Sequence, residues 1–441
     1  MLGVLKQHER PLYITLLVNF AIMGAVVTVF GAAIPKVIGT YHWSYTDAGT
    51  VIAASSAGFF LSSFIVGFMI ERFGVKVVLA GGLTAQVVSL MFFARTPVVL
   101  ANVFLNFLIG IGLGTNELVT NYTVVRIEER GKSRLMNLIH SAWCIGAIVG
   151  PLGVANLIRE QVSWQVVFPT IGVLVAGMSA LLMLQRFPDL AERHGESRPP
   201  VRGRGAAAAL AAGGVQEAAD REKGTVRGGE PPVANARNAA VPVGAGGIVL
   251  LCAASIFVYI GVEKGVYSWV SEFFVSVLGT AVSLGATAVA VYWIGQFLGR
   301  LVLSIFYRGT RLELVLLVLC IATVGALALL VLMHIVWLAL ACTLLAGMAN
   351  SGIFPVIMSL TGKYSAKGRS VGFVTAAGGV SGMFFPFVVA RVSDAAGIQV
   401  GFSTVLLVGI ILLLLVGVVV GRVRIVDARA REGVRAGGSA G

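Results

Sequence analysis

Charged side chains are scarce in this sequence of 441 residues: they make up 12% of it, while 57% of the residues are hydrophobic. Soluble proteins carry charge at roughly 25% of their positions. The mean hydropathy of +0.91 is equally unlike a soluble chain, whose surface needs polar groups to face water. The composition therefore excludes a soluble globular protein and favours helices that cross a lipid bilayer.

Cysteine and histidine are also rare, with four and five residues. Cys144, Cys252, Cys320 and Cys342 all lie inside apolar runs and show neither a CxxC nor a His-paired spacing. We therefore expect buried free thiols, with no disulfide framework, no metal site and no cofactor. The sequence also shows no nucleophile–base pairing and no phosphate-binding loop, so we do not expect an enzyme.

What the sequence does contain is twelve apolar runs, each long enough to cross a membrane at about 20 residues per span. A polar stretch, 187–244, separates the first six runs from the last six, and a polar tail covers 422–441. Both are poor in aromatic residues, so we expect them to be disordered. The predicted spans are 11–36, 48–70, 75–94, 98–125, 135–158, 164–186, 245–273, 281–306, 312–333, 336–361, 371–393 and 399–421.

Positive charge is distributed unevenly along the chain, whose net charge is +13. If the N-terminus is cytoplasmic, 28 of the 33 Lys and Arg residues fall in cytoplasmic loops or helix ends and four fall in outer loops. This count places Arg300 in the cytoplasmic turn 300–311. Because cytoplasmic loops are enriched in Lys and Arg, the pattern predicts a multi-pass protein of the cell (inner) membrane with both termini inside. It also explains the basic charge without a nucleic-acid partner.

The two halves of the chain repeat each other. At an offset of 235 residues, Arg369 aligns with Arg134 and Pro386 aligns with Pro151. Both halves contain six spans and begin on the same side, so the repeats are parallel. The sequence predicts an all-α integral membrane protein, acting as a monomer, with two six-helix bundles at 1–186 and 245–421.

A charged motif joins the second and third spans, and its second copy has Phe306 in place of the acid. It resembles the G-x-x-x-D/E-R-x-G-x-K/R signature of the major facilitator superfamily, which latches the cytoplasmic side in the outward-facing state. The alternative is a basic turn that only sets topology. The expected cytoplasmic gate consists of Gly67, Glu71, Arg72, Gly74, Lys76 and Arg134.

Other motifs occur in order along both halves: GLGTNELVTN around Glu117, RLMNLIH ending at His140, and YIGVE ending at Glu263. They resemble one branch of that superfamily, the fucose/galactose/glucose:proton symporter family. The resemblance implies the major facilitator fold and uptake of a hexose or related small polar solute with a proton or a sodium ion. Two positions depart from the branch. The stretch 30–32 lacks its usual Asp, and Glu272 stands where many members have Asn.

Glu117 and Glu263 are carboxylates within predicted spans, where a charge is costly, so both are expected to couple transport to protons. Burial favours the neutral form, which would let Glu117 load and release a proton. The alternative is a structural carboxylate in a permanent pair. Glu263 is expected in the cavity as a hydrogen-bond acceptor for the solute or as a second proton site. Gly261 and Gly265 would allow its helix to break there.

Lys264 and His140 each leave two possibilities. Lys264 could neutralise one of the acids or extend outward to the membrane surface. His140 could be a packing residue or part of a proton path. Because sugars stack on aromatic rings and bond to amides and carboxylates, we expect a site of both kinds. The expected substrate-binding residues are Asn121, Asn137, His140, Trp143, Tyr259, Glu263, Lys264, Trp269, Tyr292, Trp293 and Asn350.

Two other functions remain open. Gly146, Gly150 and Pro151 resemble part of an antiporter signature that ends in Gly-Gly, where this chain has Val154 and Ala155. Proton-coupled efflux of drugs or metabolites is therefore the alternative function. A receptor or scaffold that transports nothing fits the duplicated halves and the charged motif less well.

Overall fold

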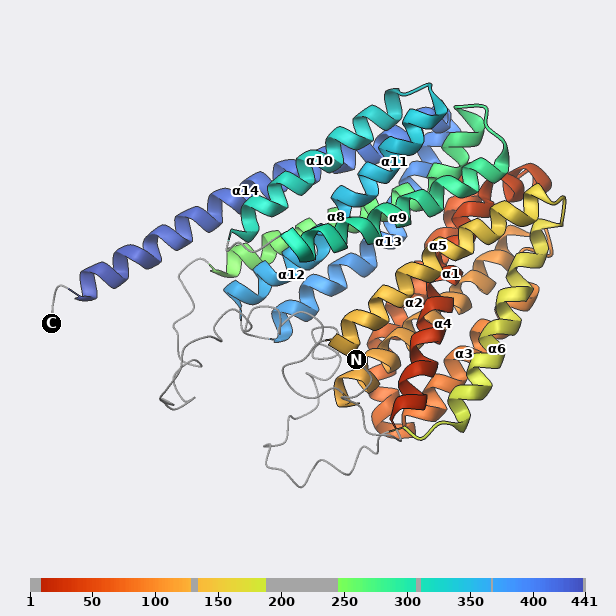
Figure 1. Ribbon diagram of the computed structural model, residues 1–441, viewed down its shortest axis with the longest axis horizontal. Coiled ribbons are helices and arrows are strands. Elements are labelled where there is room, and N and C mark those ends of the chain that lie inside the picture. The colour runs from red at the N-terminus through yellow and green to blue at the C-terminus, as the bar shows by residue number, and fades with distance from the viewer. Residues whose placement is uncertain (1–8, 128–133, 188–244, 307–310, 366–367, 439–441) are drawn as a thin grey trace.

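The computed structural model describes residues 9–127, 134–187, 245–306, 311–365 and 368–438, and these residues form helices joined by short turns, with no β-strand among them (Figure 1). The helices are α1 (Arg10–Tyr41), α2 (Tyr45–Phe73), α3 (Val75–Phe92), α4 (Val99–Ile127), α5 (Arg134–Arg159), the short 3₁₀ helix η2 (Trp164–Val166), α6 (Val167–Leu184), α8 (Ala245–Ser276), α9 (Val282–Phe306), α10 (Leu312–Leu332), α11 (Val336–Asn350), α12 (Ile353–Tyr364), α13 (Gly368–Ala396) and α14 (Ile398–Gly438).

Twelve helical segments in the described residues are long and apolar enough to cross a membrane, which confirms the predicted fold class. The tenth span consists of two helices, α11 and α12, joined at Ser351 and Gly352. By contrast, α8 is continuous, so the expected break in the seventh span is wrong. Gly261 and Gly265, which were expected to allow the break, instead leave room for the side chains of Phe385 and Val405 to pack against α8.

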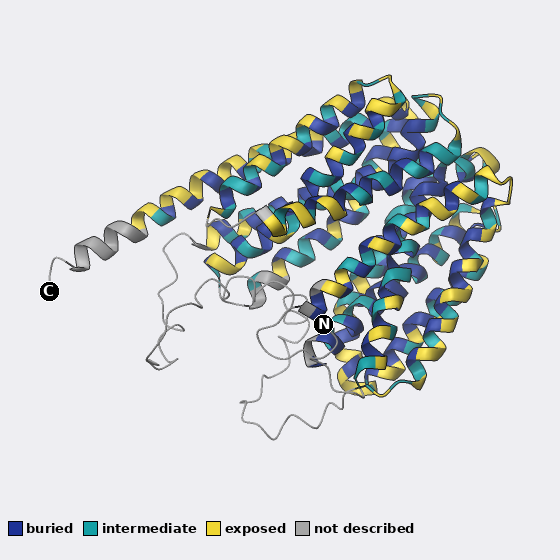
Figure 2. Cartoon of the chain, viewed as in Figure 1, coloured by how far each residue is buried: buried dark blue, intermediate teal, exposed yellow. Residues whose placement is uncertain are grey.

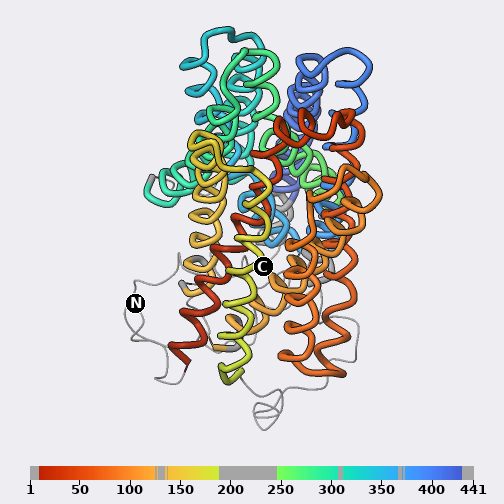
Figure 3. The backbone as a smooth tube through the Cα atoms, turned by 90° about the vertical axis from the view of Figure 1, so that its right-hand side faces the viewer, coloured from red at the N-terminus to blue at the C-terminus, as the bar shows by residue number. Residues whose placement is uncertain are grey.

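The first six spans and the last six form separate bundles, coloured red to yellow and green to blue in Figures 1 and 3. Within the bundles, α1 packs on α5 and α2 on α4, while α8 packs on α13 and α9 on α11. Adding 235 to the residue numbers of α1 and α5 gives nearly those of α8 and α13, and the same shift takes α2 to α9 and α4 to α11. The contacts in the first bundle therefore correspond to those in the second. Between the bundles, α2 packs on α13 and α5 on α9, which are also equivalent under that offset. The duplication seen in the sequence is thus a structural repeat.

The bundle has two ends. We call the end at which α1 and α8 begin the terminal side and the opposite end the far side. In Figure 1 the two bundles lie close together at the far side and diverge toward the terminal side. Figure 2 shows exposed residues along the outer faces of the helices. Many of the exposed side chains are large and apolar, among them Phe68, Phe104 and Leu414. Lipid is the solvent that such faces require.

The last helix extends further than the sequence suggested, because α14 continues from the twelfth span through the tail to Gly438. Val423 and Val426 are buried. Asp427 forms an ion pair with Lys363 at 3.0 Å and accepts a hydrogen bond from the Tyr364 hydroxyl at 2.7 Å. These contacts with α12 explain why this part of the tail is ordered. The predicted linker, 187–244, lies outside the described residues except for Phe187, so its disorder remains a prediction.

Glycines allow the closest helix crossings within the first bundle. A Cβ atom at Gly146 of α5 would overlap the backbone carbonyl oxygen of Ala21 of α1, and one at Gly150 would press on Ala25. Gly153 on the same helix is exposed, and a Cβ there would meet no atom within 4 Å. The Gly146-x-x-x-Gly150 part of the antiporter-like motif therefore has a packing role.

Replacing Gly146 with Leu should force α1 and α5 apart and destabilise the protein by about 1–3 kcal/mol or more, the usual cost of overpacking a core. Thermal unfolding of the purified protein in detergent measures this effect. Gly153→Leu is the matched control and should leave the unfolding temperature nearly unchanged. Equal losses in both variants would show that the crossing at Gly146 is not the tight contact described.

Candidate functional site: a cavity between the two bundles

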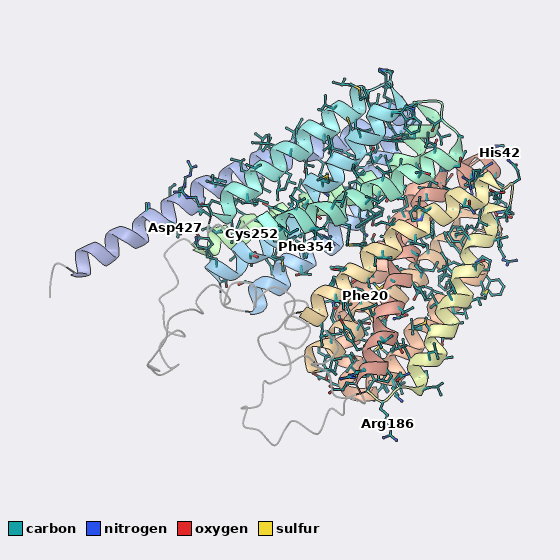
Figure 4. All side chains as sticks on the ribbon, viewed as in Figure 1. Phe20, His42, Arg186, Cys252, Phe354 and Asp427 are labelled. Atoms are coloured by element: carbon teal, nitrogen blue, oxygen red, sulfur yellow. The ribbon has the colours of Figure 1, made fainter. Side chains whose placement is uncertain are left out.

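A cavity of about 380 Å³ lies between the two bundles. This volume is within the roughly 300–1,000 Å³ typical of small-molecule sites. Helices α1, α2, α4 and α5 line it from the first bundle, and α8, α9, α12 and α13 from the second. Phe20 and Phe354, labelled in Figure 4, contribute to the two opposite walls. The lining residues come from the central parts of the helices, and those of α5, α12 and α13 lie toward the terminal side.

The far side of the cavity is closed by contacts between the bundles. Asp394, near the end of α13, accepts hydrogen bonds from the backbone N–H groups of Tyr45 and Thr46, both at 2.8 Å. Tyr45 and Thr46 are the first two residues of helix α2, which belongs to the other bundle. Asp394 therefore caps the N-terminus of that helix across the interface. Nearby, the Tyr45 hydroxyl donates to Glu272 at 3.2 Å. Glu272, one of the two departures from the symporter branch, thus belongs to this closure.

Glu117 and Glu263 both line the cavity, from α4 and α8. Oε1 of Glu263 accepts hydrogen bonds from the Tyr259 hydroxyl and from Nε2 of Gln296, each at 2.8 Å. Glu117 has no hydrogen bond or ion pair with any residue in the described part of the chain. It therefore faces the cavity without a permanent protein partner, as a group that exchanges protons requires.

Lys264 points into the cavity, where its Nζ donates to the Ser56 hydroxyl of α2 at 2.7 Å. It interacts electrostatically with both Glu117 and Glu263, although it forms no ion pair with either of these described residues. The alternative in which Lys264 extends outward to the membrane surface is therefore wrong. Its position beside two acids is the one expected of a neutralising cation.

Arg300 also lines the cavity, a feature that sequence reasoning missed. The sequence count assigned it to a cytoplasmic turn, but it lies inside α9, which continues to Phe306. Its Nη1 lies 3.0 Å from Sγ of Cys144 on α5, so the side chain bridges the two bundles. A cation well inside an apolar run could have identified it, because such residues are rare in spans and usually functional.

Aromatic rings form one wall of the cavity. Trp143 of α5 and Trp293 of α9 meet edge to face across the two bundles, with ring centroids 4.7 Å apart. Tyr267 lies against Trp293 at 5.6 Å. His140 packs its edge against Phe20 at 5.3 Å while its ring remains exposed to the cavity. Its two expected roles, in packing and in a proton path, are therefore compatible.

Four of the expected binding residues do not line the cavity. Asn350 donates a hydrogen bond to the Tyr292 hydroxyl at 2.7 Å. The side-chain amide of Gln296 donates both to that hydroxyl and to Glu263. Asn350 and Tyr292 therefore form a layer behind the Glu263 carboxylate. Trp269 is buried and donates to the Pro386 carbonyl at 3.2 Å. Asn121 lies one turn beyond Glu117, outside the lining. The side chain of Asn137 lies outside the described residues.

The expected gate motif lies at the terminal side, in the turn between α2 and α3. Gly67 is buried, while Glu71 and Arg72 are exposed. Gly74 has a φ of 81°, a conformation that favours glycine and allows the sharp turn. Lys76 donates to the Met183 carbonyl of α6 at 3.2 Å. The motif thus contacts its own bundle in this state, and the side chain of Arg134 is not described.

Comparisons with known proteins agree with this architecture. The profile of the Major Facilitator Superfamily matches residues 16–365. Protein TsgA of Shigella flexneri is 21% identical over 398 residues, which are 88% of each chain. The crystal structure of the nucleoside transporter NupG has a TM-score of 0.70 at 13% identity, with 94% of this chain and 100% of that chain covered. That of a D-xylose–proton symporter has a TM-score of 0.66 at 14% identity, with 93% and 97% covered.

Replacing Asp394 with Ala should weaken the far-side closure, because it removes two charge-assisted hydrogen bonds to a helix N-terminus. A capping interaction of this kind contributes about 0.5–2 kcal/mol, so the population open at the far side should rise roughly 2- to 30-fold. The distance between spin labels at the exposed far-side positions Gln161 and Ala281 reports this opening.

The matched control is Asp47→Ala, on the same helix terminus. Asp47 accepts from the backbone N–H of Ser44 within its own bundle, at 3.0 Å. Its loss should fray the start of α2 without separating the bundles. An unchanged distance distribution in Asp394→Ala would exclude the proposed role of Asp394 in closure.

Proposed function

The chain belongs to the Major Facilitator Superfamily, a family of membrane transporters for small-molecule solutes, and we propose that it takes up a hexose or a related small polar solute by proton-coupled symport. The observation that carries this proposal is the cavity of solute size between the two bundles, closed on one side and lined by aromatic rings and two carboxylates. Transport proceeds by alternating access, in which the bundles rock about the solute.

The distribution of Lys and Arg indicates which side of the bundle faces the cytoplasm. Lys76, Arg311 and Lys363 lie at the terminal side, whereas Arg95 and Arg159 lie at the far side. Removing Arg300 from the earlier count leaves the strong excess at the terminal side, so we assign that side to the cytoplasm. In this assignment the structure is the inward-facing state of a protein of the cell membrane.

A hydroxylated solute suits the lining. Trp143, which is partly exposed, provides a ring against which the C–H face of a sugar can stack, while the buried rings of Trp293 and Tyr267 support it. Glu263, Lys264 and Ser56 provide acceptors and donors for hydroxyl groups. Two proteins of similar fold, a nucleoside transporter and a D-xylose–proton symporter, also carry hydroxylated solutes by their descriptions.

Proton coupling rests on Glu117 and Glu263, since the first span offers no carboxylate. A proton that crosses about 150 mV releases about 3.5 kcal/mol. That energy could sustain roughly a few hundred-fold accumulation of a neutral solute. The fixed hydrogen bonds of Glu263 suit a role in orienting the solute, and the open position of Glu117 suits proton exchange.

The decisive test is uptake of radiolabelled hexoses into proteoliposomes with an imposed proton gradient, an imposed sodium gradient or none. Proton-coupled symport predicts accumulation only with the proton gradient. If no hexose moves or competes while cationic drugs are expelled, efflux is the function and the symport proposal is wrong.

Replacing Glu117 with Gln should abolish gradient-driven accumulation while leaving counterflow exchange, because exchange requires solute binding but no net proton movement. The matched control is Glu160→Gln, the same change at an exposed far-side position outside the cavity. It should transport like the unaltered protein. Normal accumulation in the Glu117 variant would remove this residue from the coupling role.

A further inference from the structure

We propose that Arg300 is the anchor of an anion subsite in the cavity and that the solute is a polyhydroxylated carboxylate, an acidic sugar of the hexuronate or aldonate class. This inference rests on the proposed function and narrows its substrate class. It starts from a cation whose hydrogen-bonding capacity the protein leaves largely unused.

Arg300 lines the cavity from α9 but forms no ion pair with any carboxylate in the described part of the chain. Its hydrogen bond to a described residue is the 3.0 Å contact between Nη1 and Sγ of Cys144. A thiol is a weak acceptor, and a guanidinium carries five N–H donors. Holding such a group among apolar helices is costly unless an anion or water completes its coordination.

The nearest acid does not supply that anion. Glu263 interacts with Arg300 electrostatically, but its Oε1 already accepts from Tyr259 and Gln296 within its own bundle. Those two hydrogen bonds hold the Glu263 carboxylate in place. The remaining donors of Arg300 are therefore available for a bound carboxylate, whose two oxygens match the planar guanidinium fork.

The charge balance of the lining favours an anion that travels with a proton. The described lining contains two acids, Glu117 and Glu263, and two basic side chains, Lys264 and Arg300, with His140 counted as neutral and all four other groups counted as charged. A neutral sugar accompanied by a proton would leave this site with one excess positive charge. A monocarboxylate accompanied by a proton on Glu117 keeps it balanced, which the low-dielectric interior favours.

The groups beside Arg300 suit the rest of such a molecule. Trp293 lies on the same helix two turns earlier and meets Trp143 of the other bundle edge to face. Its indole Nε1 is buried and has no acceptor among the described residues. Lys264 of α8 and Ser56 of α2 also line the cavity and are joined by a hydrogen bond. A carboxylate at Arg300 thus places a hydroxylated ring or chain against the aromatic wall.

The test compares D-glucuronate with D-glucose, which differ only in a carboxylate in place of the C6 hydroxymethyl group. Dissociation constants of both labelled compounds are measured with the full-length protein in lipid nanodiscs. We expect glucuronate to bind about 10- to 100-fold more tightly, the gain typical of charge-assisted hydrogen bonds. Arg300→Gln should remove this preference, and Arg300→Lys, which keeps the charge but lacks the fork, should retain part of it.

Two controls separate the subsite from general effects. Arg311→Gln removes a cation at the start of α10, outside the cavity, and should keep the preference for glucuronate. Cys144→Ala removes the thiol contact and should also keep it, because the thiol is not the anion's partner. If Arg300→Gln does not fold, the Arg300→Lys variant and the comparison of the two ligands in the unaltered protein still decide the matter.

The outcomes distinguish this inference from the proposed function. Equal binding of glucose and glucuronate, or a preference that survives in Arg300→Gln, overturns the anion subsite and leaves hexose transport standing. If lactate or benzoate binds in an Arg300-dependent way while neither glucose nor glucuronate binds, the anion subsite is upheld and the sugar proposal is overturned. Binding of none of these compounds overturns both.

Transport itself gives a second test. Symport of one proton with one monocarboxylate moves no net charge, so a pH gradient should drive glucuronate uptake into proteoliposomes and a membrane potential alone should not. Potential-driven uptake as strong as the pH-driven uptake would show that one proton does not balance the anion, and the charge argument would be wrong.

Discussion

A charge held at membrane depth must face water or a polar partner, and the rest of this structure is arranged around that constraint. The apolar helices pack through glycine-containing crossings and leave a cavity between the two bundles, to which both bundles contribute charged side chains. Glu117, Glu263, Lys264 and Arg300 all face that region and not the lipid. The cost of their burial is what makes the cavity sensitive to the charge of a solute or a proton.

The two bundles share a fold but differ in chemistry. The basic residues Lys264 and Arg300 and the hydrogen-bonded acid Glu263 come from the second bundle, whereas the first contributes Glu117, which has no hydrogen bond to a described residue. This division places the carboxylate proposed to exchange protons and the groups proposed to orient the solute on opposite walls. Rocking of the bundles therefore changes the distances between them, and that is a physical route by which proton binding and solute binding can influence each other.

Closure of the cavity uses backbone groups as well as side chains. Asp394 binds the N-terminus of α2 through two N–H groups that no residue of α2 can satisfy in the same way. Such a contact forms or breaks as a unit, because both bonds depend on one carboxylate. The equivalent interface on the other side of the repeat, between α5 and α9, instead carries Arg300 against Cys144. Of the two equivalent interfaces, the one between α2 and α13 closes the far side, and the one between α5 and α9 lines the cavity.

Some features could be predicted from the sequence because they depend on local composition. The number of spans, the duplication and the exclusion of a soluble fold follow from hydropathy and spacing, since lipid accepts only helices with satisfied backbones. Whether a residue lines the cavity depends on how its helix is rotated and where it crosses its neighbours. Those crossings are set by small residues that lie far apart in the sequence. For this reason Lys264 and Trp143 were found but Arg300 was missed, and Tyr292 and Asn350 lie behind the wall they were expected to form. The sequence alone determined that the chain is a duplicated bundle of membrane helices; only the tertiary structure decided which charges share the cavity, because that depends on how the two bundles meet.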